Sequence, residues 1–282
     1  MKGFKAVNIL LSFVLSIFLF LASTLGALYF SFFNEDKVLN MFISEEYISS
    51  SYADFMNSME ALSTPSYIAE ECYNRIFSKD RYEKDLKKFF SETFKTGEFY
   101  DISSDTDDMI EVLEKNISLY GEENGIEITD AIRENISEFS LQSVEKYKKY
   151  ISVNYVQYYS KICSRFEQWV LLGSVGAVCI TLLGILILFK SRYEDHDTVY
   201  NYLSYSFSAG ALLTCILPFY SLFTGLYKNI NIRPNYIYNI IRALLFSIQN
   251  TFFAFSGVLL ILGILFAIVA SIKLQRCEYE NV

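Results

Sequence analysis

The hydrophobic residues of this chain are gathered into four long uncharged runs. Each run exceeds the ~20 residues that a helix needs to cross the hydrocarbon core of a bilayer. None of them contains Asp, Glu, Lys, Arg or His, and they cover Ala6–Asn34, Gln168–Phe189, Val199–Tyr227 and Ala243–Ile272. The pattern therefore predicts an all-α, polytopic membrane protein with four transmembrane helices.

Polar and apolar positions alternate with helical spacing in the segment between the first two runs. One apolar stripe recurs every three or four residues, at Val144, Tyr147, Ile151, Tyr155, Tyr158, Ile162, Phe166 and Trp169. No helix-breaking residue separates this stripe from the second run. We therefore predict one continuous helix from Val144 to Phe189, ~69 Å long at 1.5 Å per residue. A second continuous helix is predicted to leave the first run and cover Glu35–Leu62.

Helix-boundary residues mark further elements in the same segment. Thr64 followed by Pro65 predicts an N-cap with proline at the first helical position. Asp80 with Glu83 resembles a capping box. Other boundaries are predicted at Gly97, Gly121 and Thr129. Since no period-2 alternation persists, we predict a helical bundle of roughly 130 residues, large enough for its own core.

The last two runs carry their own breaks. Pro218 is predicted to kink the third span near Thr214, because proline lacks the N–H that the helix needs there. Pro234 is predicted to start a helix that lies at the headgroups and turns into the fourth span near Gln249. The predicted segments are 1–33 (tail and first span), 34–167 (extracytoplasmic helical domain), 168–190 (second span), 191–198 (cytoplasmic loop), 199–227 (third span), 228–248 (outer loop with interfacial helix), 249–273 (fourth span) and 274–282 (cytoplasmic tail).

Charge is distributed unevenly between the membrane and polar parts. The chain has a net charge of −8, whereas residues 34–167 carry 27 acidic and 15 basic side chains, a net charge of −12. Such an acidic domain argues against nucleic acid as a partner. Lys and Arg near the span ends favour cytoplasmic N- and C-termini with the acidic domain outside. The basic residues of Met1–Lys5 also suggest a signal peptide, but the long first run favours an uncleaved anchor.

Candidate chemistry is sparse. The single histidine, His196, lies among Glu194, Asp195 and Asp197, where a divalent metal is conceivable but a solvated acidic loop is favoured. The acids Asp101, Asp105, Asp107, Asp108 and Glu111 do not fit a calcium loop: no glycine follows at the sixth position and Asn116 replaces the closing glutamate. Cys72 and Cys163 are the one pair that an outside location allows to form a disulfide. We predict no catalytic residue, metal or cofactor.

Small residues recur four positions apart inside every span. The pairs are Ala22/Gly26, Gly173/Ala177, Ser206/Gly210 and Gly263/Ala267. Such pairs let helices approach closely in lipid, where apolar surface alone gives no drive to associate. We predict helix contacts at these positions, with chance as the alternative.

Three features of the layout carry a resemblance: Phe33-Asn34-Glu35-Asp36 after the first span, the turn at Pro65, and Tyr202–Ala211 opening the third span. The chain resembles a loosely defined group of uncharacterised four-span integral membrane proteins of low-GC Gram-positive bacteria. Members of that group hold a helical extracytoplasmic insert between spans one and two. The resemblance implies no known activity and no catalytic residues. From its predicted spans we expect a multi-pass plasma-membrane protein.

These patterns favour a non-enzymatic role. We predict that the helical domain binds a partner or ligand outside the cell and is coupled to the membrane bundle, as a sensor or scaffold. The alternative is a channel or transport-accessory subunit. The expected partners are the lipid bilayer and a membrane or extracytoplasmic protein.

Overall fold

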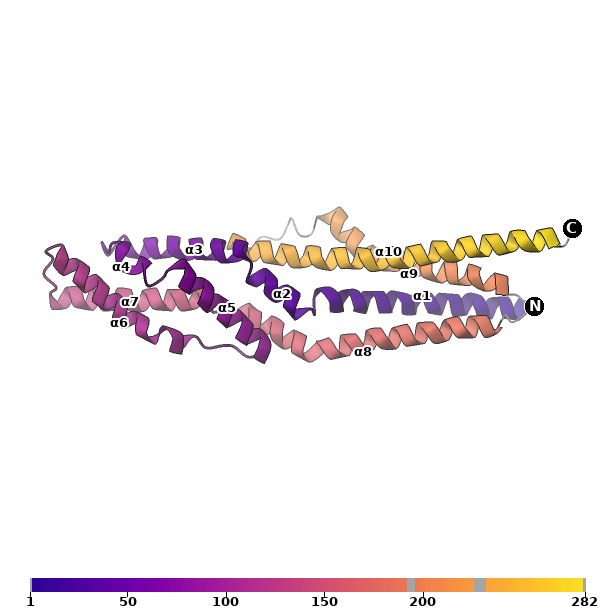
Figure 1. Ribbon diagram of the computed structural model, residues 1–282, viewed down its shortest axis with the longest axis horizontal. Coiled ribbons are helices and arrows are strands. Elements are labelled where there is room, and N and C mark those ends of the chain that lie inside the picture. The colour runs from indigo at the N-terminus through magenta and orange to yellow at the C-terminus, as the bar shows by residue number, and fades with distance from the viewer. Residues whose placement is uncertain (1, 192–195, 226–231, 281–282) are drawn as a thin grey trace. The chain divides into compact units, whose positions relative to one another are not determined.

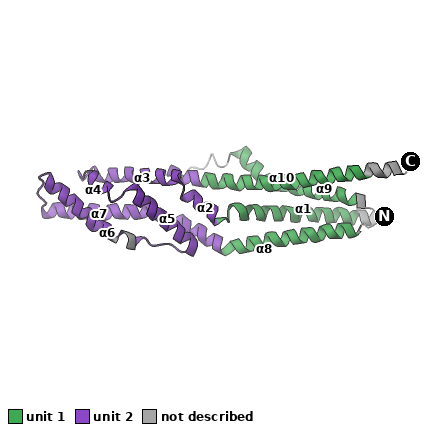
Figure 2. Cartoon of the chain, in the orientation of Figure 1, with its two compact units in different colours: residues 1–34, 165–232, 241–282 green, residues 35–164, 233–240 purple. Residues whose placement is uncertain are grey.

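The computed structural model describes residues 2–191, 196–225 and 232–280, and these form helices and loops without a strand. The helices, labelled in Figure 1, are α1 (Lys2–Ser31), α2 (Glu35–Phe42), α3 (Glu45–Ser63), α4 (Glu71–Asn74), α5 (Lys79–Thr96), α6 (Ser103–Glu123), α7 (Asp130–Ile151), α8 (Asn154–Ser191), α9 (His196–Thr224) and α10 (Asn235–Glu280). The all-helical fold class is confirmed. The chain divides into two compact units, which Figure 2 colours separately: unit 1 holds residues 1–34, 165–232 and 241–282, and unit 2 holds 35–164 and 233–240.

Unit 1 contains the four long apolar segments. Helices α1, α8, α9 and α10 are each long and apolar enough to cross a membrane, which confirms the predicted number of candidate spans. Many of their large apolar side chains are exposed, among them Leu172 at 64% and Phe223 at 87%. Such exposure is unfavourable in water but suits a surface that faces lipid.

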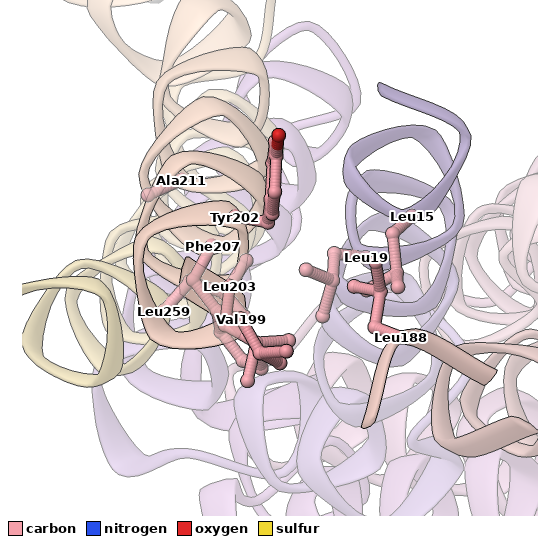
Figure 3. Packing of buried hydrophobic residues seen from close by; sticks show 9 residues of the cluster. All are labelled: Leu15, Leu19, Leu188, Val199, Tyr202, Leu203, Phe207, Ala211 and Leu259. Atoms are coloured by element: carbon pink, nitrogen blue, oxygen red, sulfur yellow. The ribbon is translucent and has the colours of Figure 1, made fainter. Parts of the chain in front are cut away.

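Helix α1 packs most extensively against α9. Ser12 Oγ donates a hydrogen bond to the carbonyl of Tyr202 (3.0 Å) and lies 2.7 Å from Ser206 Oγ. The buried apolar cluster beside these serines, drawn in Figure 3, comprises Leu15, Leu19, Leu188, Val199, Tyr202, Leu203, Phe207, Ala211 and Leu259. All four long helices contribute to it, so the bundle has one shared core.

Glycines lie where the long helices meet. A Cβ atom at Gly263 would lie 2.6 Å from Ser208 Oγ, and one at Gly210 would lie 3.0 Å from Leu19 Cβ. A Cβ atom at Gly173 would lie 3.1 Å from Leu25 Cδ1, and one at Gly26 would lie 3.0 Å from Phe255 Cε1. These four contacts confirm the helix approaches predicted from the small-residue pairs.

Unit 2 is a helical bundle with an aromatic core. The ring of Phe55 on α3 packs on Phe77, on Tyr82 of α5 and on Tyr147 of α7, with ring centroids 5.4–5.7 Å apart. All four side chains are fully buried. Buried Tyr hydroxyls need partners, and these have them: Tyr82 pairs with Ser51, and Tyr147 donates to Asp85 Oδ2 at 2.7 Å.

The predicted continuous helix from the first run to Leu62 is wrong. Helix α1 ends at Ser31, where Phe33 N–H bonds to the carbonyl of Leu28 across a wider turn. A second break follows α2, because Ser44 takes an extended conformation and its hydroxyl accepts a bond from Tyr47 N–H, capping α3. Three helices therefore replace one.

The predicted continuous helix from Val144 is also wrong, although no break occurs near Arg165. Helix α7 ends at Ile151 and α8 begins at Asn154. The break rotates the buried face: Val144, Tyr147 and Ile151 are buried as predicted, whereas the next stripe positions are exposed. On α8 the buried residues of unit 2 are instead Val156, Ser160 and Cys163.

Several boundary predictions need correction. Thr64 closes α3 rather than opening a helix, and Pro65 lies in the following turn. The cap of α5 is Ser78, whose hydroxyl accepts from Arg81 N–H, two residues before Asp80. Helix α6 runs past Gly121 to Glu123. The C-cap at Gly97 (φ +70°) and the N-cap at Thr129 are confirmed.

The helices of the last two spans differ in regularity. Pro218 lies inside α9, and Figure 1 shows the C-terminal part of α9 turned away from the rest of the helix, in keeping with the predicted kink. By contrast, α10 is continuous from Asn235 through Gln249. The predicted turn there is wrong: the helix is unbroken through Thr251, whose hydroxyl donates to the carbonyl of Ser247 at 2.8 Å.

Candidate functional site

Most of the side chains considered for metal binding lie outside the part of the chain that the structure describes. Glu194 and Asp195 lie outside the described residues, as do the side chains of His196, Asp197, Asp105 and Asp107. Among the described residues no three His, Cys, Asp or Glu side chains come together to hold a metal. Hydrogen bonds from the Ser103 side chain and from Ser103 N–H (2.9 Å) lower the pKa of Asp101, which fits a helix-start role.

Cys72 and Cys163 are buried, and they do not form a disulfide with each other. Burial raises the pKa of the Cys72 thiol, with the neighbouring Glu71 acting in the same direction. A thiol in this environment stays protonated and unreactive at neutral pH. The structure therefore supports packing roles for both cysteines.

Unit 2 has a polar groove where α7 gives way to α8. We call it the junction groove: a cavity of about 910 Å³ lined by Asp54, Ser58, Leu62, Gln142, Glu145, Lys146, Lys149, Tyr150, Ser152, Val153, Asn154, Tyr155, Pro234, Tyr236 and Ile237. Three stretches of chain that are far apart in the sequence meet in it: α3, the α7–α8 junction and the start of α10. Its volume lies within the range of about 300–1,000 Å³ typical of small-molecule sites.

Two hydrogen bonds join α3 and α7 along the groove. Tyr150 OH donates to Asp54 Oδ2 at 3.0 Å, and Lys146 Nζ donates to the carbonyl of Ser58 at 3.2 Å. Asp54 and Ser58 are one helical turn apart, as are Lys146 and Tyr150, so the two helices run antiparallel here. Neither Asp54 nor Lys146 forms an ion pair within the described residues. The Asp54 carboxylate and the Lys146 ammonium group therefore both line the groove, at levels that differ by about one helical turn.

Buried side chains on both sides of the α7–α8 break fix the position of the junction. Ile151 and Val156, on either side of the break, are both fully buried. Between them Ser152 N–H still bonds to the carbonyl of Lys148 at 2.7 Å, closing α7. The segment 152–154 therefore has a fixed place in unit 2 while its polar groups line the groove.

Three tyrosines line the groove: Tyr150 on α7, Tyr155 on α8 and Tyr236 on α10. The rings of Tyr47 and Tyr236 meet edge to face at 5.4 Å. Tyr82 lies deeper, and burial raises its pKa strongly, with the hydrogen bond to Ser51 opposing the shift. Burial also raises the pKa of the three lining tyrosines, so their hydroxyls remain neutral at physiological pH and offer hydrogen bonds and ring faces rather than charge.

A second cavity, the tip pocket, lies among the end of α3, α4, the end of α6 and the start of α7. It has a volume of about 570 Å³ and is mainly aliphatic. Its floor is buried and includes Ile117, Ile136 and Phe139, whereas Tyr67 and Ile126 at its rim are exposed at 97% and 51%. Gly121 lies within the wall, where a Cβ would come 2.9 Å from Ile128 Cδ1.

Sequence reasoning missed both cavities. The junction groove depends on a helix break that local periodicity did not predict. The run Ile151-Ser152-Val153-Asn154 was the available signal, because all four residues have lower helix propensity than alanine or leucine. The signal for the tip pocket was the density of isoleucine on both sides of Gly125.

The described part of the chain is all-helical, and four of its helices are long and apolar enough to span a membrane. No protein-family model, curated protein or solved structure matches the chain. Its function must therefore be argued from its own residues.

Proposed function

We propose that this chain is a non-enzymatic, multi-pass plasma-membrane receptor or scaffold whose unit 2 lies outside the cell, with both termini in the cytoplasm. The observation that carries the proposal is the composition of the junction groove. Its walls include the residues that lead into α8 and the first residues of α10. A ligand in the groove contacts two helices whose later residues form apolar spans, so binding can be coupled to the membrane part.

The chemistry of the groove favours binding over catalysis. Asp54, Glu145, Lys146 and Lys149 line it with no net formal charge, accompanied by Tyr hydroxyls and ring faces. No histidine lines it, and no nucleophile–base pair is placed there. Polar groups of both signs around a partly apolar cavity suit recognition of a ligand or peptide that itself carries both charges.

The binding role is tested by co-purification of the full-length protein from its native membranes. The groove variant exchanges two exposed charges one turn apart, Glu145→Lys with Lys149→Glu. The matched control exchanges an equivalent exposed pair on α6, Glu111→Lys with Lys115→Glu. We expect wild type and control to retain a molecule that the groove variant loses. A small molecule supports a sensor, a protein supports a scaffold, and identical co-purified material from all three proteins refutes the groove as the binding surface.

Coupling between the groove and the apolar part of α8 can be measured at a native residue. Trp169, the only tryptophan of the chain, lies in α8 and is 72% exposed. Addition of the retained molecule to stripped protein in nanodiscs is expected to change the quenching of Trp169 by lipid-attached quenchers. Binding without any change at Trp169 contradicts coupling and leaves a scaffold.

The outside location of unit 2 is tested separately by thiol labelling in intact cells. Cys72 is a poor reporter because it is 4% exposed, so an exposed position on α6 is used instead, as Glu123→Cys. We expect a membrane-impermeant maleimide to label this residue in intact cells and Cys277 only after lysis. The reverse order of labelling refutes the topology.

A second function, as a transport-accessory subunit, is favoured by polar atoms inside unit 1. Gln249 Oε1, Ser247 Oγ and Thr24 Oγ1 are buried and have no hydrogen-bond partner among the described residues. Unpaired polar groups in membrane helices are costly and often mark solute paths or partner contacts. Solute flux in reconstituted liposomes that is lost in Gln249→Leu supports this function, and absence of flux in the wild type counts against it.

A further inference from the structure

The tip pocket of unit 2 combines features that the junction groove lacks. Its floor is closed by buried aliphatic and aromatic side chains, and its opening is edged by apolar residues that remain in solvent. Its volume of about 570 Å³ is sufficient for a ligand that buries aliphatic groups. An exposed apolar pocket in an otherwise polar surface commonly marks a place where a partner binds.

The rim residue Tyr67 is held in an unusual backbone conformation. Its φ is +55°, a left-handed value that is rare for a bulky residue. The turn is closed by a bond from Tyr67 N–H to the carbonyl of Thr64 at 3.3 Å, and the side chain is 97% exposed. The fold thus presents a large ring at the opening of the pocket at a conformational cost that no buried contact of the ring offsets.

The segments that build the tip pocket are strongly acidic: Glu138 lines it, and Glu122, Glu123 and Glu127 are chain neighbours of its lining residues Gly121, Ile126 and Ile128. The two segments that build it, residues 60–76 and 117–139, carry nine acidic and two basic side chains, a net charge of −7. All nine carboxylates are on exposed residues. Within the described part of the chain none of them forms an ion pair with Lys or Arg. Their field disfavours an anionic ligand and attracts a cationic one.

We infer that the tip pocket is a docking site for a cationic amphipathic peptide segment, with the segment's aliphatic side chains in the pocket and its Lys or Arg side chains on the acidic rim. Tyr67 offers a ring face to a cation or to an apolar side chain. Anionic lipid and nucleic acid are disfavoured by the same rim. The tip pocket adjoins the junction groove, with Leu62 and Gln142 lining both, but the inference requires neither groove binding nor an outside location.

Binding is measured by fluorescence anisotropy with the full-length protein in a detergent with uncharged headgroups. The probe is a labelled peptide of about ten residues with leucines at helical spacing and lysines between them. Two matched peptides separate the contributions: one replaces lysine with glutamate, the other replaces leucine with serine. Empty micelles provide the background. We expect saturable binding of the first peptide only.

Protein variants locate the site. Replacing the exposed rim acids, as Glu122→Gln, Glu123→Gln and Glu127→Gln together, is expected to weaken binding about tenfold. The control triple Glu46→Gln, Glu98→Gln and Glu111→Gln changes the net charge equally, away from the pocket, and should bind like wild type. Tyr67→Gly removes the ring and relieves the backbone, so binding should fall while the melting temperature stays the same or rises.

Three results overturn the inference. Equal binding of the lysine and glutamate peptides removes the role of the rim. Equal binding of the leucine and serine peptides removes the role of the pocket. Equal weakening by the rim and control triples shows only general attraction to an acidic protein. Since none of these measurements involves groove residues, failure here is distinguishable from failure of the proposed function.

Discussion

Truncation of the central core ring, Phe55→Ala, tests the architecture of unit 2 most directly. Phe55 is fully buried and contacts the rings of Phe77, Tyr82, Tyr147 and Tyr150 at 5.4–5.7 Å. A buried phenylalanine removes ~150–250 Å² from water, which corresponds to about 4–6 kcal/mol at 25 cal/mol per Å². Truncations of this kind measure about 3–5 kcal/mol. We expect a loss in that range.

The assay is thermal unfolding of the full-length protein in detergent, followed by near-ultraviolet circular dichroism of its tyrosines. The expected loss lowers the melting temperature of unit 2 by roughly 10 °C. The matched control is Phe99→Ala, because Phe99 is 37% exposed and its ring contacts that of Phe89 at 5.4 Å. A control shift of a few degrees at most is expected. Equal shifts for Phe55→Ala and Phe99→Ala refute the aromatic core.

Two further predictions concern unit 1 and alkaline pH. Gly263→Leu is expected to disrupt the α9–α10 contact, because its Cβ would meet Ser208 at 2.6 Å, whereas Gly257→Leu, with open space around it, should be tolerated; fluorescence-detected size exclusion separates the two outcomes. Burial raises the pKa of Tyr47 and Tyr82 above the ordinary value of 10.0, so their stabilisation is complete below pH 10 and is lost as pH rises further. The tyrosinate absorbance of these two buried residues should therefore appear only together with unfolding, and titration of every tyrosine while the fold persists contradicts the burial.

Structural features that depend only on a short stretch of chain could be predicted from the sequence. Four uncharged runs are enough to give four candidate spans, since crossing a bilayer requires only length and apolarity. Gly97 and Thr129 were identified because left-handed backbone and a hydroxyl cap are properties of single residues. Small residues four apart predicted close helix contacts for a similar reason: the absence of a side chain is itself the feature.

The sites could not be predicted because they depend on long-range contacts. Asp54 and Tyr150 are 96 residues apart, and nothing in either local sequence indicates the partner. Tyr236 joins the same groove from beyond two candidate spans. The tip pocket likewise requires the turn after α3 to take a conformation that Thr64-Pro65 did not suggest. Its Tyr67 adopts a positive φ that sequence statistics would assign to glycine.

The α7–α8 break shows whether local helix propensity or long-range packing determines where a helix ends. Ser and Val each cost about 0.5 kcal/mol relative to alanine inside a helix, so Ser152→Ala with Val153→Ala favours a continuous helix by about 1 kcal/mol. Continuity would rotate the chain after the break and expose Val156 or Ile151, both fully buried. Each contributes about 1.5–3 kcal/mol by its burial, which exceeds the gain in propensity.

We therefore expect the break to persist in the double alanine variant. The amides of residues 153–155, at the start of α8 and without intrahelical partners, should still exchange rapidly in hydrogen-exchange mass spectrometry. Ile151→Ala is the complementary variant, because it removes one buried anchor and leaves Ser152 and Val153 unchanged. Strong protection of residues 153–155 in the double alanine variant would mean that local propensity sets the junction. The groove would then be a consequence of two weak helix formers rather than of the packing around them.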